Sequence, residues 1–319
     1  MYAICIETSH KRGMGHLFRA IAFCDYLKEQ NLPYLLLIND DPKAQSILSS
    51  RREPYLVINC HDIVSDWETE IIRKHEIRVW IDDRLDTQYQ HAQHVKKNRI
   101  GLVTLDDHGS GAALADIHIA ALAFSGRDAL QGKKVLVGKE YLILNREIDT
   151  YKRLRKGAGR IIITLGGSDT YGVTVDIVRM MGELDLAASV HIGPLFAHQE
   201  ALNRYSGERF DIIDQPPSLM FALANYDLAI TGGGVTPFEA NASGLPCLTI
   251  SSEDHERESC AYLHELGTSR YLGHRNDLIT PQLLRNALET INIPSMSKAG
   301  MLKISTKGAK RIIEHIGRL

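Results

Sequence analysis

The sequence predicts an α/β protein built from two doubly wound domains that face each other across a cleft. Three observations indicate this: short apolar runs alternate with longer amphipathic stretches, the rhythm breaks near mid-chain and restarts, and 319 residues are long for one hydrophobic core. Strands joined by helices imply a parallel sheet, because parallel pairing needs a long crossover connection.

In the first half of the chain, apolar runs alternate with helical segments. The helix expected at His16–Glu29 carries one apolar stripe, with the spacing of a face that packs on a sheet. A second helix is expected at Thr87–Lys97. The strands expected here are Tyr2–Glu7, Tyr34–Ile38, Tyr55–Ile58, Val79–Asp82, Gly101–Leu105 and Ile117–Ala120.

A polar stretch at Asp149–Arg160 interrupts this rhythm and is typical of a linker. We therefore expect a first domain at 1–150 and a second at 151–319. The strands expected in the second domain are Ile161–Thr164, Ser189–Ile192, Phe210–Ile213, Leu228–Thr231 and Cys247–Ile250.

Composition excludes several classes of function. A hydrophobic content of 44% with 24% charged residues is that of a soluble globular protein, and a formal charge of −2 offers no general attraction for nucleic acid or anionic lipid. The N-terminal apolar run is too short for a secretory signal, and no run approaches the roughly 20 residues that span a bilayer. Five scattered cysteines without a Cys-x-x-Cys pair indicate a reducing cytoplasm.

Three glycine-rich turns each lie between an expected strand and a helix. They are Gly13-Met14-Gly15-His16, Gly166-Gly167-Ser168-Asp169 and Gly232-Gly233-Gly234-Val235-Thr236-Pro237-Phe238-Glu239. Such turns aim backbone N–H groups and a helix dipole at one point, which suits a phosphate. No dinucleotide or Walker-type fingerprint is present, which disfavours an NAD enzyme or an ATPase. The alternative for any single turn is a tight connection without a ligand.

The third turn is the most informative of these. Its glycines let the backbone approach a diphosphate, and the Thr236 hydroxyl can donate to it or cap the helix. Glu239 lies one turn into the helix, where it can accept from ribose hydroxyls or reach back as a capping-box carboxylate.

Two acidic pairs end strands of the first domain, Asp82-Asp83 and Asp106-Asp107. Adjacent residues of a strand point to opposite sides, so we expect each pair to send one carboxylate into the site. Each of these residues has a second interpretation as a strand-end cap or turn former.

Together these motifs and the segment Ser243-Gly244-Leu245-Pro246 resemble the PseG family of UDP-sugar hydrolases, which is similar to the spore-coat polysaccharide protein SpsG. The resemblance covers most of the chain. It implies Rossmann-like domains of the GT-B-like kind, and release of UDP from a UDP-linked amino and deoxy sugar in pseudaminic acid biosynthesis. It also implies that no metal or other cofactor is needed.

The resemblance implies a division of labour in which the second domain binds UDP and the first presents His16 to the sugar. His16 is then the base that takes a proton from the attacking water, with helix capping as the alternative. Arg19 either orients a sugar or phosphate group or is a solvated charge, and Asp82 is a candidate to orient His16.

Arg84 departs from the family pattern, because it stands where these proteins commonly have a tyrosine that assists the histidine. A guanidinium offers a fixed cationic fork suited to a carboxylate or phosphate. The departure therefore indicates either an acidic sugar or a loop with a changed role.

The segment Ser251-Ser252-Glu253-Asp254-His255 resembles the family loop that closes over the nucleotide-sugar. Either serine can bind phosphate or cap the next helix. The expected catalytic residues are thus His16, Asp82 and Arg84. The expected substrate-binding residues are Gly13, Gly15, Arg19, Asp106, Asp107, Gly166, Gly167, Ser168, Asp169, Gly233, Gly234, Val235, Thr236, Glu239, Ser251, Ser252 and His255.

Three functions follow from this pattern. The first is hydrolysis of a UDP-sugar in nonulosonic acid or surface polysaccharide biosynthesis. The second is glycosyl transfer from a UDP-sugar, with His16 activating an acceptor hydroxyl. The third is binding of a nucleotide-sugar without catalysis. No nucleic acid or membrane partner is expected, and the sequence leaves the oligomeric state open.

Overall fold

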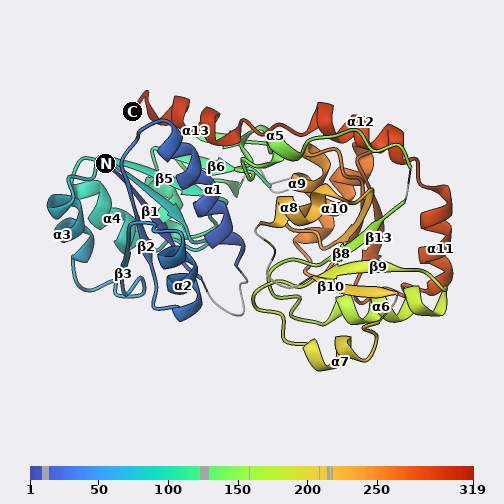
Figure 1. Ribbon diagram of the computed structural model, residues 1–319. Helices are drawn as coiled ribbons and strands as arrows, with labels where there is room; N and C mark the ends of the chain where they lie inside the picture. Colours follow the sequence, from blue (N-terminus) through green and yellow to red (C-terminus); the bar gives the residue numbers. More distant parts are fainter. Residues whose placement is uncertain (9–13, 123–128, 158, 208, 214–215, 217) are drawn as a thin grey trace. The chain divides into compact units, whose positions relative to one another are not determined.

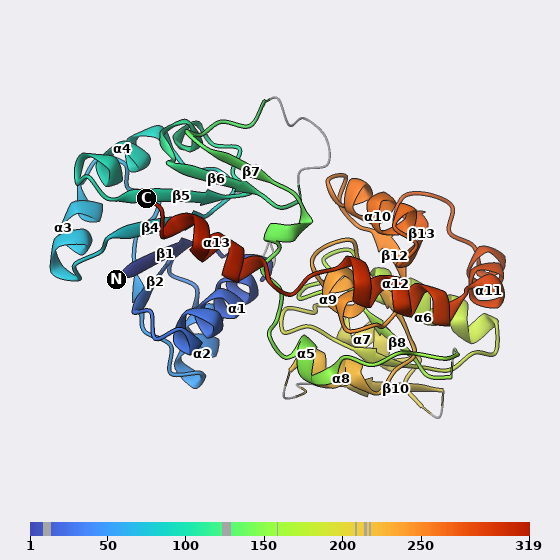
Figure 2. The same ribbon diagram turned by 90° about the horizontal axis from the view of Figure 1, so that it is seen from above.

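The computed structural model describes the whole chain except residues 9–13, 123–128, 158, 208, 214–215 and 217. Its internal contacts divide it into two compact units. Unit 1 comprises Met1–Ile143 and Lys307–Leu319, and unit 2 comprises Leu144–Thr306. Each unit contains one parallel sheet with helices around it (Figure 1 and Figure 2). The α/β class with two parallel-sheet domains is therefore confirmed.

The sheet of unit 1 has seven strands in the order β3-β2-β1-β4-β5-β6-β7. The order reverses between β1 and β4, and ligands of doubly wound sheets bind beyond the carboxyl ends of the strands at such a point. The strands are β1 Tyr2–Ile6, β2 Tyr34–Ile38, β3 Tyr55–Val57, β4 Val79–Asp83, β5 Gly101–Leu105, β6 Ile117–Ala120 and β7 Val135–Val137. The helices are α1 Gly15–Glu29, α2 Pro42–Ser50, α3 Trp67–Lys74, α4 Tyr89–Lys97 and α13 Gly308–Ile316, with short 3-10 turns at Ser110–Leu114 and Lys139–Tyr141.

The sheet of unit 2 has six strands in the order β10-β9-β8-β11-β12-β13, with its reversal between β8 and β11. The strands are β8 Ile161–Thr164, β9 Ala188–His191, β10 Phe210–Ile213, β11 Leu228–Thr231, β12 Cys247–Ser251 and β13 Ser269–His274. The helices are α5 Ile148–Tyr151, α6 Val173–Glu183, α7 Gln199–Asn203, α8 Leu219–Ala224, α9 Thr236–Ala242, α10 Glu256–Glu265, α11 Pro281–Thr290 and α12 Ile293–Lys303.

The sequence missed one edge strand in each sheet, β7 and β13. Strand β7 has only three residues, and β13 has the mixed sequence SRYLGH with partly exposed positions. An edge strand pairs on one side only, so it needs less of the continuous apolar character that marks a central parallel strand.

The C-terminal helix α13 belongs to unit 1, whereas the sequence analysis assigned it to the second domain. Arg311 Nη1 donates to the Glu140 carbonyl at 2.9 Å. A Cβ on Gly308 would lie 1.9 Å from the Leu142 carbonyl oxygen, so glycine is required for this close approach. The chain crosses between the units at Ile143/Leu144 and again at Thr306/Lys307, rather than once after residue 150.

The polar stretch expected as a linker docks on unit 2 through Arg155. This guanidinium is fully buried, and it donates to the carbonyls of Tyr226, Arg153 and Ser243. The Arg155 backbone N–H donates to Ser297 Oγ at 2.9 Å. The Ser243 carbonyl lies at the end of α9, where carbonyl groups lack helical partners and favour a cation.

Each unit has its own apolar core. The core of unit 2 contains Ile163, Val190 and Ile230 from the strands with Ile177 from α6 and Leu284 from α11. A core of unit 1 lies between the sheet and the α3–α4 pair and includes the fully buried Trp80. In the described part of the chain, no helix combines the length and the apolar character that a membrane crossing requires.

Candidate functional site

Strand β4 sends its two final carboxylates to opposite faces of the unit 1 sheet. Asp83 pairs in register with Ile6 of β1 and meets α1, whereas Asp82 pairs with Cys5 and meets α4. Alternation along an extended strand produces this split. One carboxylate of the pair therefore reaches the edge where α1 begins, and that carboxylate is Asp83.

His16 lies in the first turn of α1, directly beside Asp83. Its Nδ1 is 2.5 Å from Asp83 Oδ1, and both side chains are almost fully buried. Burial would raise the pKa of Asp83, but the charges of Arg19 and His16 outweigh burial and hold that pKa well below its usual range. An ionised carboxylate only accepts hydrogen bonds, so His16 Nδ1 carries a proton and donates it to Asp83, and Nε2 is the ring nitrogen without a hydrogen-bond partner among the described residues.

Arg19 joins this pair to a neighbouring strand end. Its Nε donates to Asp83 Oδ2 at 2.8 Å, and its two Nη atoms donate to Asp83 Oδ1 and to Asp106 Oδ2. Burial lowers the pKa of Arg19, and the two carboxylates more than reverse this effect. The sequence analysis left Arg19 as a substrate ligand or a solvated charge, and the structure instead pairs it with two carboxylates.

The expectation that Asp82 orients His16 is wrong, because Asp82 faces the other side of the sheet. It accepts from Trp80 Nε1 at 3.0 Å, and both of its oxygens lie 3.1 Å from His91 Nε2. His91 Nδ1 lies 2.7 Å from Glu68. Burial lowers the pKa of His91, but the flanking carboxylates raise it to about 9. This buried chain fastens α3 and α4 to the sheet.

Arg84 follows β4 and is only 1% exposed. Its Nη2 donates to the Cys60 carbonyl at 2.7 Å and lies 4.0 Å from Glu7 Oε2. Burial lowers the pKa of Arg84, and nearby acidic groups raise it above the ordinary value. The guanidinium is therefore engaged by groups of unit 1 at the carboxyl ends of its strands.

The second acidic pair also divides its roles. Asp106 has a positive φ of 48°, pairs with Arg19 and accepts from the Leu122 N–H at 3.3 Å. Asp107 is buried and accepts from Thr87 N at 3.0 Å and from Gly109 N at 2.7 Å. Asp107 is thus a turn former, the alternative left open for it, while Asp106 belongs to the charged cluster.

In unit 2, the turn at Gly166–Asp169 connects β8 to α6. Asp169 caps the helix, accepting from Val173 N at 3.0 Å and Thr174 N at 2.8 Å, and Ser168 Oγ lies 3.1 Å from Thr170 Oγ1. Gly166 has a φ of 86°, which explains its glycine. A Cβ on Gly193 would lie 2.5 Å from the Cα of Gly167, so glycine is required at position 193.

Gly193 therefore takes part in a close contact between the loop after β9 and the turn after β8, and the sequence analysis did not predict this role. Leu195 N donates to the Gly167 carbonyl at 2.9 Å, which brings the loop after β9 against the turn after β8. The Gly193-Pro194 pair was the available signal.

The glycines between β11 and α9 differ in what a side chain would meet at each position. A Cβ on Gly233 would lie 2.6 Å from Glu256 Cβ and 2.7 Å from Cys260 Sγ, so this glycine allows α10 to approach. A Cβ on Gly234 would lie 3.6 Å from Glu256 Oε1, an ordinary contact. The need for glycine at 233 thus comes from helix packing, which differs from the expected close approach to a diphosphate.

Helix α9 begins at Thr236, after Val235 at the N-cap position, and has no side-chain cap. Glu239 Oε1 instead accepts from the Asn145 N–H at 3.0 Å, so the capping-box interpretation does not hold. Burial raises the pKa of Glu239 to about 7, against the opposing effect of that hydrogen bond. Glu239 is therefore a carboxyl group of raised pKa at the strand-end edge of unit 2.

The remaining predicted residues lie at the end of β12 and in the loop that leads to α10. Ser251 Oγ is buried and 2.7 Å from Tyr271 Oη, while His255 is exposed at the start of α10. The N–H groups of Ser252 and Glu253 donate to Glu256 Oε2 at 2.7 and 3.3 Å. Two adjacent N–H groups aimed at one point form an anion site, and here a carboxylate of the protein occupies it.

Two further points concern the predicted residues. Gly13 lies outside the described residues, and Gly15 begins α1 with nothing near its Cβ position.

Among the described residues, two groups bring three potential metal-ligand atoms within 4.8 Å of one another, Glu7–Cys60–His61 and Asp66–Glu68–His94. Lys97 donates to Asp66, and Arg84 lies beside Glu7, so a cation of the protein already accompanies each group.

The two edges offer different chemistry. Unit 1 presents an imidazole whose Nδ1 is fixed by an ionised carboxylate, an arrangement suited to taking a proton at Nε2. Unit 2 presents backbone N–H groups, helix starts and one carboxyl of raised pKa, an arrangement suited to a polar, phosphorylated ligand.

No family model matches the chain. The chain is 22% identical to the spore coat polysaccharide biosynthesis protein SpsG of Bacillus subtilis, and the match covers 97% of this chain and 95% of that protein. It is also 25% identical to the protein MJ1062 of Methanocaldococcus jannaschii over 279 residues. That match covers 80% of this chain but spans only 56% of the archaeal relative.

Solved structures resemble both units over the full chain. MurG of Acinetobacter baumannii matches with a TM-score of 0.71 at 13% identity, covering 100% of this chain and 99% of that one. Anabaena HepE in complex with UDP matches at 0.67 with 13% identity, covering 100% of both chains. A glycosyltransferase from Rickettsia africae matches at 0.67 with 12% identity, covering 99% and 98%. The likeness shows the predicted two-domain GT-B fold.

Proposed function

We propose that this protein hydrolyses a UDP-sugar. Water attacks the anomeric carbon, the bond to the diphosphate oxygen breaks, UDP leaves, and His16 Nε2 takes the proton of the attacking water. The contact between His16 Nδ1 and Asp83 carries this proposal, because it fixes the ring and leaves one basic nitrogen for the reaction. A good leaving group means that a positioned, activated water is the chief requirement.

Unit 2 binds the UDP moiety in this proposal. The turns at Gly166–Asp169 and Gly232–Glu239, with the loop of Ser251, Ser252 and His255, surround the switch point where its strand order reverses. The UDP in HepE supports a nucleotide at such a fold. In this proposal Glu239 accepts from ribose hydroxyls, and the N–H groups after β12 donate to phosphate oxygens.

The substrate class in this proposal is a UDP-linked amino and deoxy sugar used in nonulosonic acid or surface polysaccharide biosynthesis. The likeness to SpsG supports a role in polysaccharide biosynthesis. In unit 1, Asp83 and Arg19 position His16, and Asp106 accepts a hydrogen bond from Arg19. Arg84 contacts the Cys60 carbonyl at the same strand-end edge.

A second candidate is glycosyl transfer, favoured by the likeness to the Rickettsia glycosyltransferase. His16 then takes the proton of an acceptor hydroxyl rather than of water, and unit 2 binds the same UDP moiety. Binding of a nucleotide-sugar without turnover is the third.

The experiment incubates the purified protein with a panel of UDP-sugars, with GDP-sugars as control, and no acceptor. Hydrolysis releases UDP and free sugar in equal amounts, and water carrying heavy oxygen labels the sugar rather than the UDP. UDP release that begins only after an acceptor is added identifies a transferase. Tight UDP binding with no release under either condition identifies a binding protein.

A further inference from the structure

Side chains of two other segments contact the loop between β12 and α10, residues 252–255. They are Tyr171, just before α6, and Arg275, just after β13. We propose that Tyr171 and Arg275, through Glu253, form a latch that positions this loop to receive the UDP-sugar. The proposal rests on the proposed function, in which this loop contacts the substrate. Tyr171 and Arg275 are positioning residues, since they act through the loop rather than on the reacting atoms.

Arg275 holds the rear of the loop. It follows β13, and its backbone N–H donates to the Ser251 carbonyl at 2.8 Å. Its side-chain Nε donates to the next carbonyl, that of Ser252, at 2.8 Å. One residue therefore fixes two successive peptide groups at the point where the chain leaves β12. Because the carbonyls of these peptides are turned towards Arg275, their orientation in the loop is set.

Tyr171 links this assembly to the start of α6. Its ring lies under the Arg275 guanidinium, with Cζ 3.5 Å from the ring centroid. Its hydroxyl donates to Glu253 Oε1 at 2.8 Å, and this hydrogen bond raises the pKa of Tyr171. Tyr171 lies two residues after Asp169, which caps α6. The latch thus joins the turn after β8 to the loops after β12 and β13.

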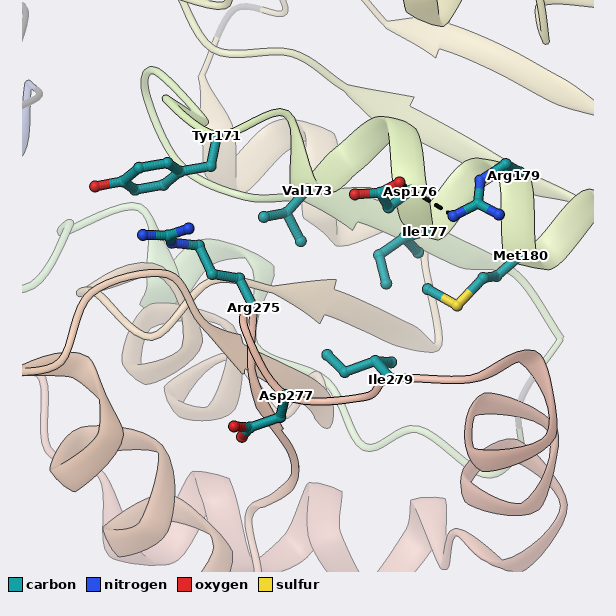
Figure 3. A pocket seen from close by; sticks show the side chains of 9 residues that line it. All are labelled: Tyr171, Val173, Asp176, Ile177, Arg179, Met180, Arg275, Asp277 and Ile279. Carbon is teal, nitrogen blue, oxygen red and sulfur yellow. Dashed lines mark hydrogen bonds and ion pairs between the residues drawn. The ribbon is translucent and has the colours of Figure 1, made fainter.

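The surroundings show that polar contacts, rather than close packing, make this connection. A pocket of about 240 Å³ lies between α6 and the segment after β13, with Tyr171 and Arg275 along one end and Val173, Ile177 and Ile279 among its lining (Figure 3). Tyr171 is 43% exposed. An exposed aromatic ring beside an open pocket gains little from burial, so its hydrogen bond and its stacking on Arg275 account for its position.

Glu256, the first residue of α10, also contacts this loop. Its carboxylate accepts from the N–H groups of Ser252 and Glu253, the groups proposed to meet phosphate. A phosphate must displace this carboxylate to reach them, so the peptides must keep their orientation while Glu256 leaves. The latch holds the same peptides by their carbonyls and by the Glu253 side chain, and it supplies that rigidity.

The first test measures hydrogen exchange of the amides at 252–255 in the ligand-free protein. Tyr171→Phe keeps the ring and removes the bond to Glu253, while Arg275→Gln removes the stacked cation. Both variants should exchange these amides about fivefold faster than the wild type. Arg179→Gln is the matched control, because Arg179 lines the same pocket but bonds only to Asp176 and Glu183 of α6 among the described residues. Unchanged exchange in both latch variants would overturn the proposal.

The second test measures UDP affinity and steady-state kinetics of the same variants. The dissociation constant for UDP and the KM should rise about fivefold, with kcat within about twofold of the wild type, since the latch acts on binding geometry. Faster exchange with unchanged UDP affinity would remove the loop from the substrate site and refute the proposed role. If the wild type binds no UDP, the proposed function fails together with the substrate role of the latch, while the exchange result still decides whether the latch holds the loop.

Discussion

The strand-end edges of the two units use charge in opposite ways. In unit 1, four charged or titratable side chains from α1, β4 and the end of β5 converge in one network, consisting of His16, Arg19, Asp83 and Asp106. In unit 2, acidic side chains cap the chain's own N–H groups, as Asp169 does at α6 and Glu256 at α10. In unit 1 the charged side chains therefore pair with one another, whereas in unit 2 carboxylates occupy backbone donors of the chain.

The largest expected effect tests the base of unit 1. His16→Gln should lower kcat for UDP release about a thousandfold, roughly 4 kcal/mol of activation free energy, because it removes the proton acceptor but keeps a polar side chain. UDP affinity should stay within about twofold. Steady-state kinetics and calorimetric titration with UDP measure the two quantities, with His264→Gln, at an exposed histidine in the last turn of α10, as the control. Equal loss of turnover and UDP affinity would remove His16 from the chemistry.

The next effect separates the two carboxylates of β4. Asp83→Asn should lower the free energy of unfolding by about 3 kcal/mol, because the buried Arg19 loses its closest charge partner. It should also lower kcat, since His16 loses its orienting acceptor. Asp82→Asn disturbs the buried His91 in a similar way but faces the other side of the sheet. Urea unfolding and kinetics of both variants decide the matter, and a comparable loss of kcat in folded Asp82→Asn would contradict the assignment.

A third prediction concerns the reason for the glycines in unit 2. Gly233→Ala should destabilise the protein by about 2 kcal/mol, because its Cβ would meet Glu256 Cβ at 2.6 Å and Cys260 Sγ at 2.7 Å. The Cβ of Gly234→Ala would make only an ordinary contact, 3.6 Å from Glu256 Oε1, so this variant should be close to neutral in stability. Thermal unfolding of the two variants measures this contrast. Equal destabilisation of both would show that close packing of α10 is not what requires glycine.

A fourth prediction uses the raised pKa of Glu239. Because the folded pKa is about 7 against an ordinary 4.5, the folded state keeps a proton that the unfolded state releases between these values. The resulting stability is fully present below pH 4.5 and is lost as the pH rises towards 7, by about 1 kcal/mol for this partly buried group. Glu239→Gln should remove this part of the pH dependence. An identical stability–pH slope in wild type and variant would contradict the raised pKa.

The smallest effect concerns the carboxylate that occupies the anion site after β12. Glu256→Gln keeps an oxygen acceptor for Ser252 and Glu253 but removes the negative charge that opposes a phosphate. UDP affinity should therefore rise about threefold, roughly 0.6 kcal/mol. Calorimetric titration measures it, and Glu258→Gln in the same helix turn is the control. Weaker UDP binding in Glu256→Gln alone would mean that the charge supports the loop more than it repels the ligand.

The charged cluster of unit 1 could be predicted only in part from the sequence. Strand alternation predicts that the two carboxylates of β4 point to opposite faces of the sheet, and the contacts of Asp83 with His16 and of Asp82 with His91 agree with this. Which member of the pair faces α1 depends on the pairing of β4 with β1 and on the side of the sheet that α1 covers. Neither quantity is local, so Asp82 was chosen where Asp83 stands.

The glycines of unit 2 show a similar division. Local geometry explains Gly166 through its positive φ, and a glycine turn after a strand signals this. The requirement at Gly233 and Gly193 comes instead from atoms distant in the sequence, in α10 and in the turn after β8, and Gly308 of unit 1 is likewise required by the Leu142 carbonyl. A close approach between distant segments leaves no local pattern that separates it from a ligand-binding turn.

Local patterns in the sequence are enough for the α/β class, nearly all the parallel strands and the glycine turns after β8 and β11, because the periodicity of apolar residues and the conformational needs of glycine and proline act over a few neighbouring residues. Only the tertiary structure decided that Asp83 rather than Asp82 holds His16, that α13 returns to unit 1, and that Arg155 docks the polar stretch on unit 2. These outcomes depend on which buried charges and carbonyls find partners across the fold, and such pairing is fixed only once the elements have packed.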